Sequence, residues 1–246
     1  MKQILQNLYW NPKLLERGLN RLYYRLSDGP FNSDGVDFIE QDWDNLVILD
    51  ACRYDLFEEV SDLDGELRRV QSKASNTIQL LRSNIGGKTL TDTVYVTANP
   101  QYEKIADELD TKFHAVLNVW ADRGWDERFN TVLPAVMTEE VRQVAEEYPH
   151  KRLLAHYNQP HIPFIGPTGR ARFDMEELTE HPLPFWQQPM ANVWDINDDE
   201  IWKAYRENLE EVLPHVEELL DVLQGRTVVT ADHGNMIDER NFPLPI

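Results

Sequence analysis

The chain has 246 residues, with 43 acidic and 24 basic side chains, a formal net charge of −19 and a single cysteine, Cys52. This acidity argues against a nucleic-acid partner, because affinity for phosphate needs positive surface, and one cysteine excludes an internal disulfide and a cysteine-cluster metal site. No apolar run approaches the roughly 20 residues that cross a bilayer, and the N-terminus lacks the apolar segment of a signal peptide, so we expect a cytoplasmic protein.

The chain length and the ratio of arginine to lysine indicate the fold class and the cellular environment. A chain of this size can bury a core without disulfides, so we expect one large α/β domain. The bases divide into 16 Arg and 8 Lys. This arginine excess, together with the acidity, is typical of a halophilic protein from a high-salt cytoplasm.

The first 26 residues are basic, with five bases against one acid and hence a net charge of +4. Asn11 and Pro12 predict a helix start, because a capping residue is followed by proline at the first helical position. A basic amphipathic helix over residues 11–26 has two interpretations. It makes peripheral contact with an anionic inner membrane surface, or it docks on its own domain or on a partner.

Residues 27–36 are rich in Gly, Pro, Asn and Asp and predict a linker or an extended loop. They divide the chain into an N-terminal segment, 1–36, and a domain, 37–246, that we expect to be short at its C-terminus. In this domain continuous apolar runs alternate with helical stretches, which indicates strands buried on both faces. The expected fold is a three-layer α/β sandwich with a mostly parallel central sheet flanked by helices. The expected strands are 45–50, 93–98, 113–120, 152–157 and 226–232, and the expected helices include 138–148 and 199–225, the latter ending on Gly225 as a cap.

Two of the expected strands end in carboxylates. NLVILD ends on Asp50, and RTVVTAD ends on Asp232, which His233 follows. In an open parallel sheet, ligands bind beyond the carboxyl ends of the strands, although either acid alone could simply cap the next helix. Two carboxylates and an imidazole at one sheet edge favour a site for a divalent cation, whether Mn, Zn or Mg.

The residues just after Asp50 allow two interpretations of Arg53. Arg53 and Asp55 either cap and salt-bridge the start of the next helix, or Arg53 faces a substrate anion. A haloacid-dehalogenase-type phosphatase would need D-x-D here, and that pattern fails because Cys52 stands two residues after Asp50.

The segment KASNTIQLLRS, residues 73–83, places small polar residues before an apolar helix start. Ser75, Asn76 and Thr77 could be helix caps and nothing more. A hydroxyl at a helix N-terminus also lies where free amides and the helix dipole hold an anion. A metal ion beside it would lower the pKa of the hydroxyl and make it a nucleophile.

The segment AHYNQPHIPFIGP, residues 155–167, begins as a strand and continues into a proline-rich loop that carries His161. A rigid loop past a strand end is a plausible place for a group that binds an anionic oxygen or protonates a leaving group. His156 lies inside the strand, and we expect it to be a packed core residue. No role is assigned to His114, His150, His181 or His215.

These pieces occur in a characteristic order: a strand ending in Asp50, a helix opening at Thr77, the stretch QPHIPF, and a strand followed by the triplet D-H-G. The order resembles the alkaline phosphatase superfamily, in particular its sulfatase-like and phosphoglycerol-transferase-like branch. The similarity covers about residues 40–240. Its most specific element is the ADHG that ends the last strand.

The resemblance implies a role for each residue. Asp50, Asp232 and His233 would bind the metal, Thr77 would be both a ligand and the nucleophile, and His161 would contact the anionic oxygens of the substrate. TIQLL lacks the proline and arginine of the C/S-x-P-x-R stretch of sulfatases, and threonine nucleophiles in this family go with phosphate esters. We therefore expect the substrate to be a phosphate ester linked to a glycan or a lipid. A sulfate ester is the less favoured alternative.

Members of this family usually continue past D-H-G with another histidine and more sheet, whereas this chain ends thirteen residues after His233. Either the chain is truncated or the natural protein is short. We expect one divalent cation, which is Mn, Zn or Mg, with Ca as a further alternative. The expected activity is that of a hydrolase or a phospho-group transferase. The alternative is a catalytically degenerate member that binds an anionic glycan or lipid as an accessory protein.

Overall fold

The computed structural model describes residues 18–19, 22–23, 31–121, 124–173, 188 and 196–237. The predicted basic helix over residues 11–26 therefore lies largely outside the described part, although its four described positions are helical. Among the described residues, no helix combines the length and the apolar character needed to cross a membrane.

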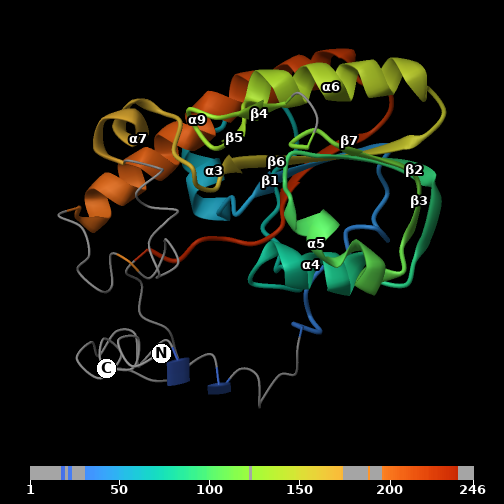
Figure 1. The fold of residues 1–246 in the computed structure, drawn as a ribbon, viewed down its shortest axis with the longest axis horizontal. Helices are drawn as coiled ribbons and strands as arrows, with labels where there is room; N and C mark the ends of the chain where they lie inside the picture. The colour runs from blue at the N-terminus through green and yellow to red at the C-terminus, as the bar shows by residue number, and fades with distance from the viewer. Residues whose placement is uncertain are drawn as a thin grey trace.

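A five-stranded parallel sheet forms the centre of the domain, in the order β3-β2-β6-β1-β7 (Figure 1). All five predicted strands are confirmed. Every residue of β1 is buried, as its continuous apolar run predicts for a strand covered on both faces. The strands are β1 (Asn45–Asp50), β2 (Thr89–Thr97), β3 (Lys112–Asn118), β6 (Arg152–Pro160) and β7 (Thr227–Ala231), and a separate small hairpin joins β4 (Trp125–Asp126) to β5 (Thr131–Val132).

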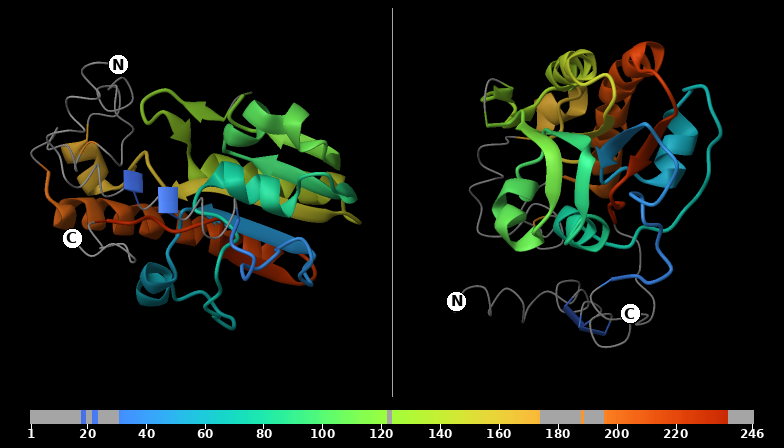
Figure 2. Two further views of the ribbon diagram at one scale, coloured as in Figure 1. Left: turned by 90° about the horizontal axis from the view of Figure 1, so that it is seen from below. Right: turned by 90° about the vertical axis from the view of Figure 1, so that its right-hand side faces the viewer.

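Helices cover both faces of the sheet, so the predicted three-layer α/β sandwich is confirmed (Figure 2). Alternate residues of each strand point to opposite faces. Val47 and Leu49 belong to one hydrophobic cluster, and Leu46 and Ile48 belong to the other. The first cluster includes residues of α3 (Tyr54–Val60), α6 (Pro134–Glu147) and α9 (Asp198–Val222), the second includes residues of α4 (Thr77–Asn84) and α5 (Gln101–Leu109), and α7 (Pro167–Arg172) packs on α9.

The longest helix, α9, ends earlier than predicted. It begins with a capping box between Asn197 and Glu200, continues through Pro214 and ends at Val222 rather than at Gly225. Gly225 has a φ of +88° and lies in the turn that leads to β7, where a Cβ atom would clash with the carboxylate of Asp44. The glycine therefore serves a tight turn before the strand and not the helix end.

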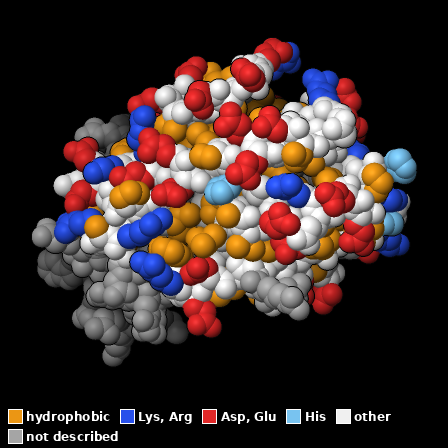
Figure 3. All heavy atoms as spheres, turned by 90° about the horizontal axis from the view of Figure 1, so that it is seen from above, with side chains coloured by type: hydrophobic (Ala, Val, Ile, Leu, Met, Phe, Trp, Pro, Cys, Tyr) orange, Lys and Arg blue, Asp and Glu red, His pale blue; other side chains and the backbone are white. Residues whose placement is uncertain are grey.

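The outer surface of the α6 and α9 layer carries many acidic side chains with a few bases among them (Figure 3). On this face of the described part, the acidic side chains are dispersed singly and do not form one large patch (Figure 3). On the opposite side, part of the predicted linker runs along the domain, since Asn32 and Val36 donate backbone hydrogen bonds to the carbonyls of Lys73 and Gln71. This pairing anchors the segment that leads into α4.

Candidate functional site

The strands β1 and β7 are neighbours and run parallel, so their carboxyl ends deliver two acids to the same edge of the sheet. Asp50 is 3% exposed and Asp232 is fully buried. One carboxylate oxygen of Asp232, Oδ1, accepts hydrogen bonds from the backbone N–H groups of Ala51 at 2.7 Å and His233 at 2.8 Å. Ala51 adopts a φ of +58°, a left-handed conformation that is uncommon for alanine and that turns the chain sharply at the end of β1.

The N-terminus of α4 brings a hydroxyl to these acids. Thr77 is the first helical residue, and its Oγ1 donates to Oδ2 of Asp232 at 2.8 Å. Asn76 is the capping residue, because its side chain accepts from the backbone N–H of Gln79 at 3.0 Å. Ser75 bonds the side chain of Gln79 instead. Of the three polar residues that the sequence offered, Thr77 is the one whose hydroxyl reaches the carboxylates.

Two further predicted residues lie at the same edge. Nε2 of His233 is 3.6 Å from Oδ1 of Asp50 and 3.5 Å from Oδ2 of Asp232. The backbone N–H of His161 donates to the carbonyl of Asp50 at 3.0 Å, and the His161 and His233 rings lie with their centroids 6.3 Å apart. The structure thus brings Asp50, Thr77, His161, Asp232 and His233 together.

A third histidine of the site was missed at the sequence level. His156 is fully buried in β6, as expected for a core residue, but its side chain faces the two acids. Its Nδ1 pairs with the hydroxyl of Tyr95 at 2.9 Å, and its Nε2 has no hydrogen-bond partner among the described residues. The predicted core position is confirmed, and because β6 lies directly beside β1 the buried imidazole also reaches the two acids at the sheet edge.

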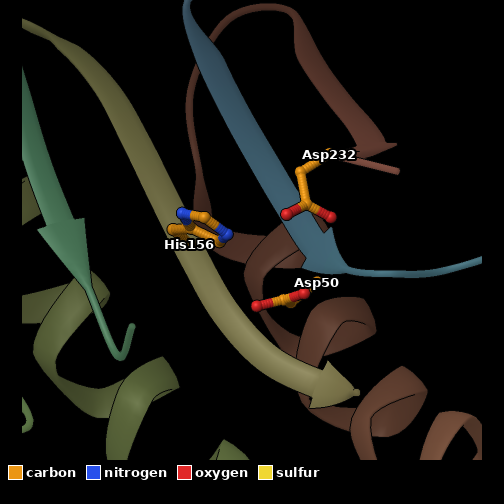
Figure 4. A group of neighbouring side chains, drawn as sticks. All are labelled: Asp50, His156 and Asp232. Atoms are coloured by element: carbon orange, nitrogen blue, oxygen red, sulfur yellow. The ribbon is translucent and has the colours of Figure 1, made fainter. Parts of the chain in front are cut away.

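Asp50, His156 and Asp232 offer ligand atoms that all lie within 4.8 Å of one another. Figure 4 shows the three side chains turned toward one another from β1, β6 and the end of β7. Oδ1 of Asp50 and Nε2 of His156 are both buried, and neither has a hydrogen-bond partner within the described ranges. Buried polar atoms are almost always satisfied, and a cation between them would satisfy both. The residues therefore fit a metal ion, whose identity the group does not specify.

The pKa shifts of Asp50 and Asp232 also fit a metal site. Burial, followed by repulsion from Asp232, raises the pKa of Asp50 well above its ordinary value. Burial alone would raise the pKa of Asp232 as well, but nearby His233 and His156 and several hydrogen bonds outweigh it and lower that pKa. Burial lowers the pKa of both His156 and His161 to about 4, so each is neutral at pH 7. Neutral imidazole beside a carboxylate that readily takes up a cation is the usual donor set of a metal centre.

No protein-family model, curated protein or solved structure matched the chain. The candidate site therefore rests on the geometry of its own residues.

Arg53 forms the predicted salt bridge with Asp55 at the start of α3. Its guanidinium forms a two-pronged ion pair with Asp55, with nitrogen–oxygen distances of 2.8 and 2.6 Å. Its Nη1 donates to the carbonyl of Asn235 at 3.0 Å, and its charge lies 4.8 Å from the centre of the Trp202 ring. Arg53 thus ties the start of α3 to the segment after His233. A contact between Arg53 and a substrate anion stays a prediction.

The loop that carries His161 is anchored by one buried amide on α9. Nδ2 of Asn208 donates to the carbonyls of Pro160, His161 and Pro163 at 3.2, 2.9 and 2.9 Å. Its Oδ1 accepts from the N–H of Ile165 at 2.7 Å. Asn208 is fully buried, so water cannot replace its amide as the hydrogen-bond partner of these loop groups.

We expect Asn208→Ala to lower the free energy of unfolding by roughly 2–4 kcal/mol, because several buried backbone groups lose their partner at once. Urea unfolding followed by circular dichroism measures the loss. Asn118→Ala is the matched control, since that amide bonds the exposed side chain of Glu103 and should cost less than about 1 kcal/mol. Equal losses in the two variants would show that Asn208 does not anchor the loop.

Proposed function

We propose that the protein is a metal-dependent hydrolase or phospho-group transferase acting on phosphate esters, less on sulfate esters, with Thr77 as nucleophile. One observation carries the proposal. The Thr77 hydroxyl opens α4 and donates at 2.8 Å to Asp232, a carboxylate of the group that fits a metal ion. If the polar residues at the start of α4 served only as helix caps, the hydrogen bond from Thr77 to Asp232 would not be needed. Membership of the alkaline phosphatase superfamily is part of the same proposal.

The cation would be held by Asp50 and Asp232, with Thr77 and the imidazoles of His233 and His156 as the remaining donors. When bound, a divalent cation supplies Lewis acidity, which stabilises anionic oxygens and lowers the pKa of a hydroxyl beside it. Mn, Zn, Mg and Ca are all compatible with a set of carboxylate and imidazole donors to differing degrees, and we favour the first three.

The residues of the chain then divide the work of an in-line displacement. Thr77 Oγ1 forms a bond to phosphorus while the bond to the leaving oxygen breaks, and the hydroxyl proton passes to Oδ2 of Asp232 along the existing hydrogen bond. Attack of water, or of an acceptor hydroxyl in a transferase, at phosphorus then breaks the bond to Thr77, whose oxygen takes back the proton. The positive end of the α4 dipole favours the anionic ester at this point. His161 would contact an anionic oxygen of the substrate in its imidazolium form, because burial keeps it neutral at pH 7 and a bound anion favours the charged form.

The substrate class follows from the same groups. We propose an anionic ester carried by a glycan or a lipid, and a cytoplasmic enzyme. A lipid-linked ester would agree with peripheral contact of residues 11–26 at the inner membrane surface, and that segment lies largely outside the described residues.

The test is hydrolysis of aryl phosphate monoester, aryl phosphodiester and aryl sulfate in high salt, with Mn, Zn, Mg or Ca added after chelation. We expect activity on a phosphate ester that disappears on metal removal and returns on readdition. Metal binding, measured by calorimetry, without turnover of any ester would favour the accessory protein that binds an anionic glycan or lipid. An absence of metal binding would overturn the proposed site.

A further inference from the structure

Asn99 is a buried amide that contacts the candidate metal site and has no assigned role so far. It lies just after β2, is 5% exposed, and follows the strand that neighbours β6 on the side away from β1. Its Oδ1 accepts a hydrogen bond from the backbone N–H of Gln101 at 2.9 Å. Because a backbone N–H can only donate, this contact fixes the orientation of the amide and turns its Nδ2 toward the site.

The two oxygens of Asp50 are consequently in different states. Nδ2 of Asn99 donates to Oδ2 of Asp50 at 2.5 Å. Oδ1 of the same carboxylate is buried and has no hydrogen-bond partner in the described part of the chain. Asn99 therefore occupies Oδ2 and leaves Oδ1, which lies 3.6 Å from Nε2 of His233, without a hydrogen bond from the described residues.

The backbone holds Asn99 rigidly enough to act in this way. Its N–H donates to Oγ1 of Thr97 at 2.9 Å, and the same hydroxyl donates back to the Asn99 carbonyl at 3.2 Å. Together with the bond from Gln101, these contacts fix both the main chain and the side chain of Asn99. A side chain held at both ends loses little freedom when it positions a neighbour.

We propose that Asn99 is a positioning residue that restricts Asp50 to one coordinating oxygen and thereby makes the site select small divalent cations over Ca²⁺. Ca²⁺ takes six to eight oxygen ligands and often binds carboxylates through both oxygens, whereas the smaller ions Mg²⁺, Mn²⁺ and Zn²⁺ accept fewer ligands at shorter distances. A carboxylate with one oxygen held by Asn99 gives Ca²⁺ one oxygen ligand fewer than a bidentate carboxylate would. The inference rests on the cation site of the proposed function.

The experiment compares Mn²⁺ and Ca²⁺ binding by calorimetry in the parent chain and in Asn99→Ala. We expect the parent to prefer Mn²⁺. In Asn99→Ala, the freed carboxylate should bind Mn²⁺ about 10- to 100-fold more weakly, as losses of such supporting hydrogen bonds do, and should bind Ca²⁺ no more weakly. The ratio of the two affinities should thus fall at least about tenfold.

Asn84→Ala is the matched control. Asn84 is a fully buried amide at the far end of α4, where it bonds the backbone of Phe38 and Leu80, so its loss perturbs folding without reaching Asp50. Its Mn²⁺-to-Ca²⁺ ratio should equal that of the parent. If Asn99→Ala does not fold, Asn99→Asp decides, because it keeps the acceptor for Gln101 and replaces the donor by a second anionic oxygen. The ratio should fall in that variant too.

The outcomes separate the two proposals. A parent chain that binds neither cation refutes the metal site and this inference with it. A parent that binds Mn²⁺ while the Asn99 variants keep its ratio refutes the inference alone. A parent that binds Ca²⁺ more tightly than Mn²⁺ also refutes the inference and leaves the metal site standing.

Discussion

Replacing Thr77 by alanine is expected to abolish ester hydrolysis, with a loss of at least about 1,000-fold in kcat, because the nucleophilic oxygen is removed. The fold should survive. The side chain hydrogen-bonds Asp232 and also lies within hydrogen-bonding reach of Asp50, and its loss should cost about 1–2 kcal/mol of unfolding free energy. Steady-state kinetics on the ester that the parent hydrolyses, together with thermal unfolding, measures both quantities.

Two variants control this result. Thr77→Ser keeps the hydroxyl at the start of α4 and should retain activity within about tenfold of the parent, since only a methyl group is lost. Ser75→Ala removes a hydroxyl two residues earlier that bonds Gln79 and not the carboxylates, and it should leave kcat unchanged. Activity in Thr77→Ala close to that of the parent would remove Thr77 from the role of nucleophile.

Replacing Asp232 by asparagine is expected to remove the stabilisation that a cation confers. A ligand at 100 times its Kd stabilises the folded parent by about 2.7 kcal/mol, and without Asp232 this gain should be close to zero. An asparagine oxygen can still accept from the N–H groups of Ala51 and His233. In chelator two effects oppose each other, because Asp50 loses its like-charged neighbour while His233 and His156 lose the carboxylate that attracts them.

Asp232→Ala separates charge from hydrogen bonding. It leaves the N–H groups of Ala51 and His233 unpaired at a buried site and should cost roughly 2–4 kcal/mol even without a cation. Asp221→Asn, an exposed acid near the end of α9, is the control for removal of one negative charge and should keep the full response to the cation. A normal melting shift with Mn²⁺ in Asp232→Asn would place the cation elsewhere.

The sheet could be predicted from sequence because its signal is local. Each run such as NLVILD is apolar throughout, and a strand buried on both faces needs no alternation. The placement of Asp50 and Asp232 at one edge followed from parallel strands alone. The end of α9 was mispredicted because a glycine after a helical pattern can serve either a helix cap or a later turn, and Gly225 serves the turn.

The histidine in β6 and the amide after β2 could not be predicted, because their role depends on strand order. Only in the order β2-β6-β1-β7 does β6 bring His156 beside Asp50. A signal was nevertheless present in the alternation of side chains along each strand. Leu46, Ile48 and Leu154 share the face of α4 and α5, and counting on by two reaches Asp50 and His156. A polar residue at such a position in a buried strand is informative once the neighbouring strand is known.

The hydrogen bond between Ala51 and Asp232 joins residues 181 positions apart in the chain. Closing a loop of this length costs entropy that is offset only once the strands on both sides have paired. The two acids meet only after β7, the last described strand, has paired with β1. Cation binding therefore requires a completed sheet, so a chain that has folded only through β6 should have neither affinity for the cation nor a competent nucleophile. Acquisition of the metal would accordingly mark the end of folding and would slow subsequent unfolding by closing the chain between its first and last described strands.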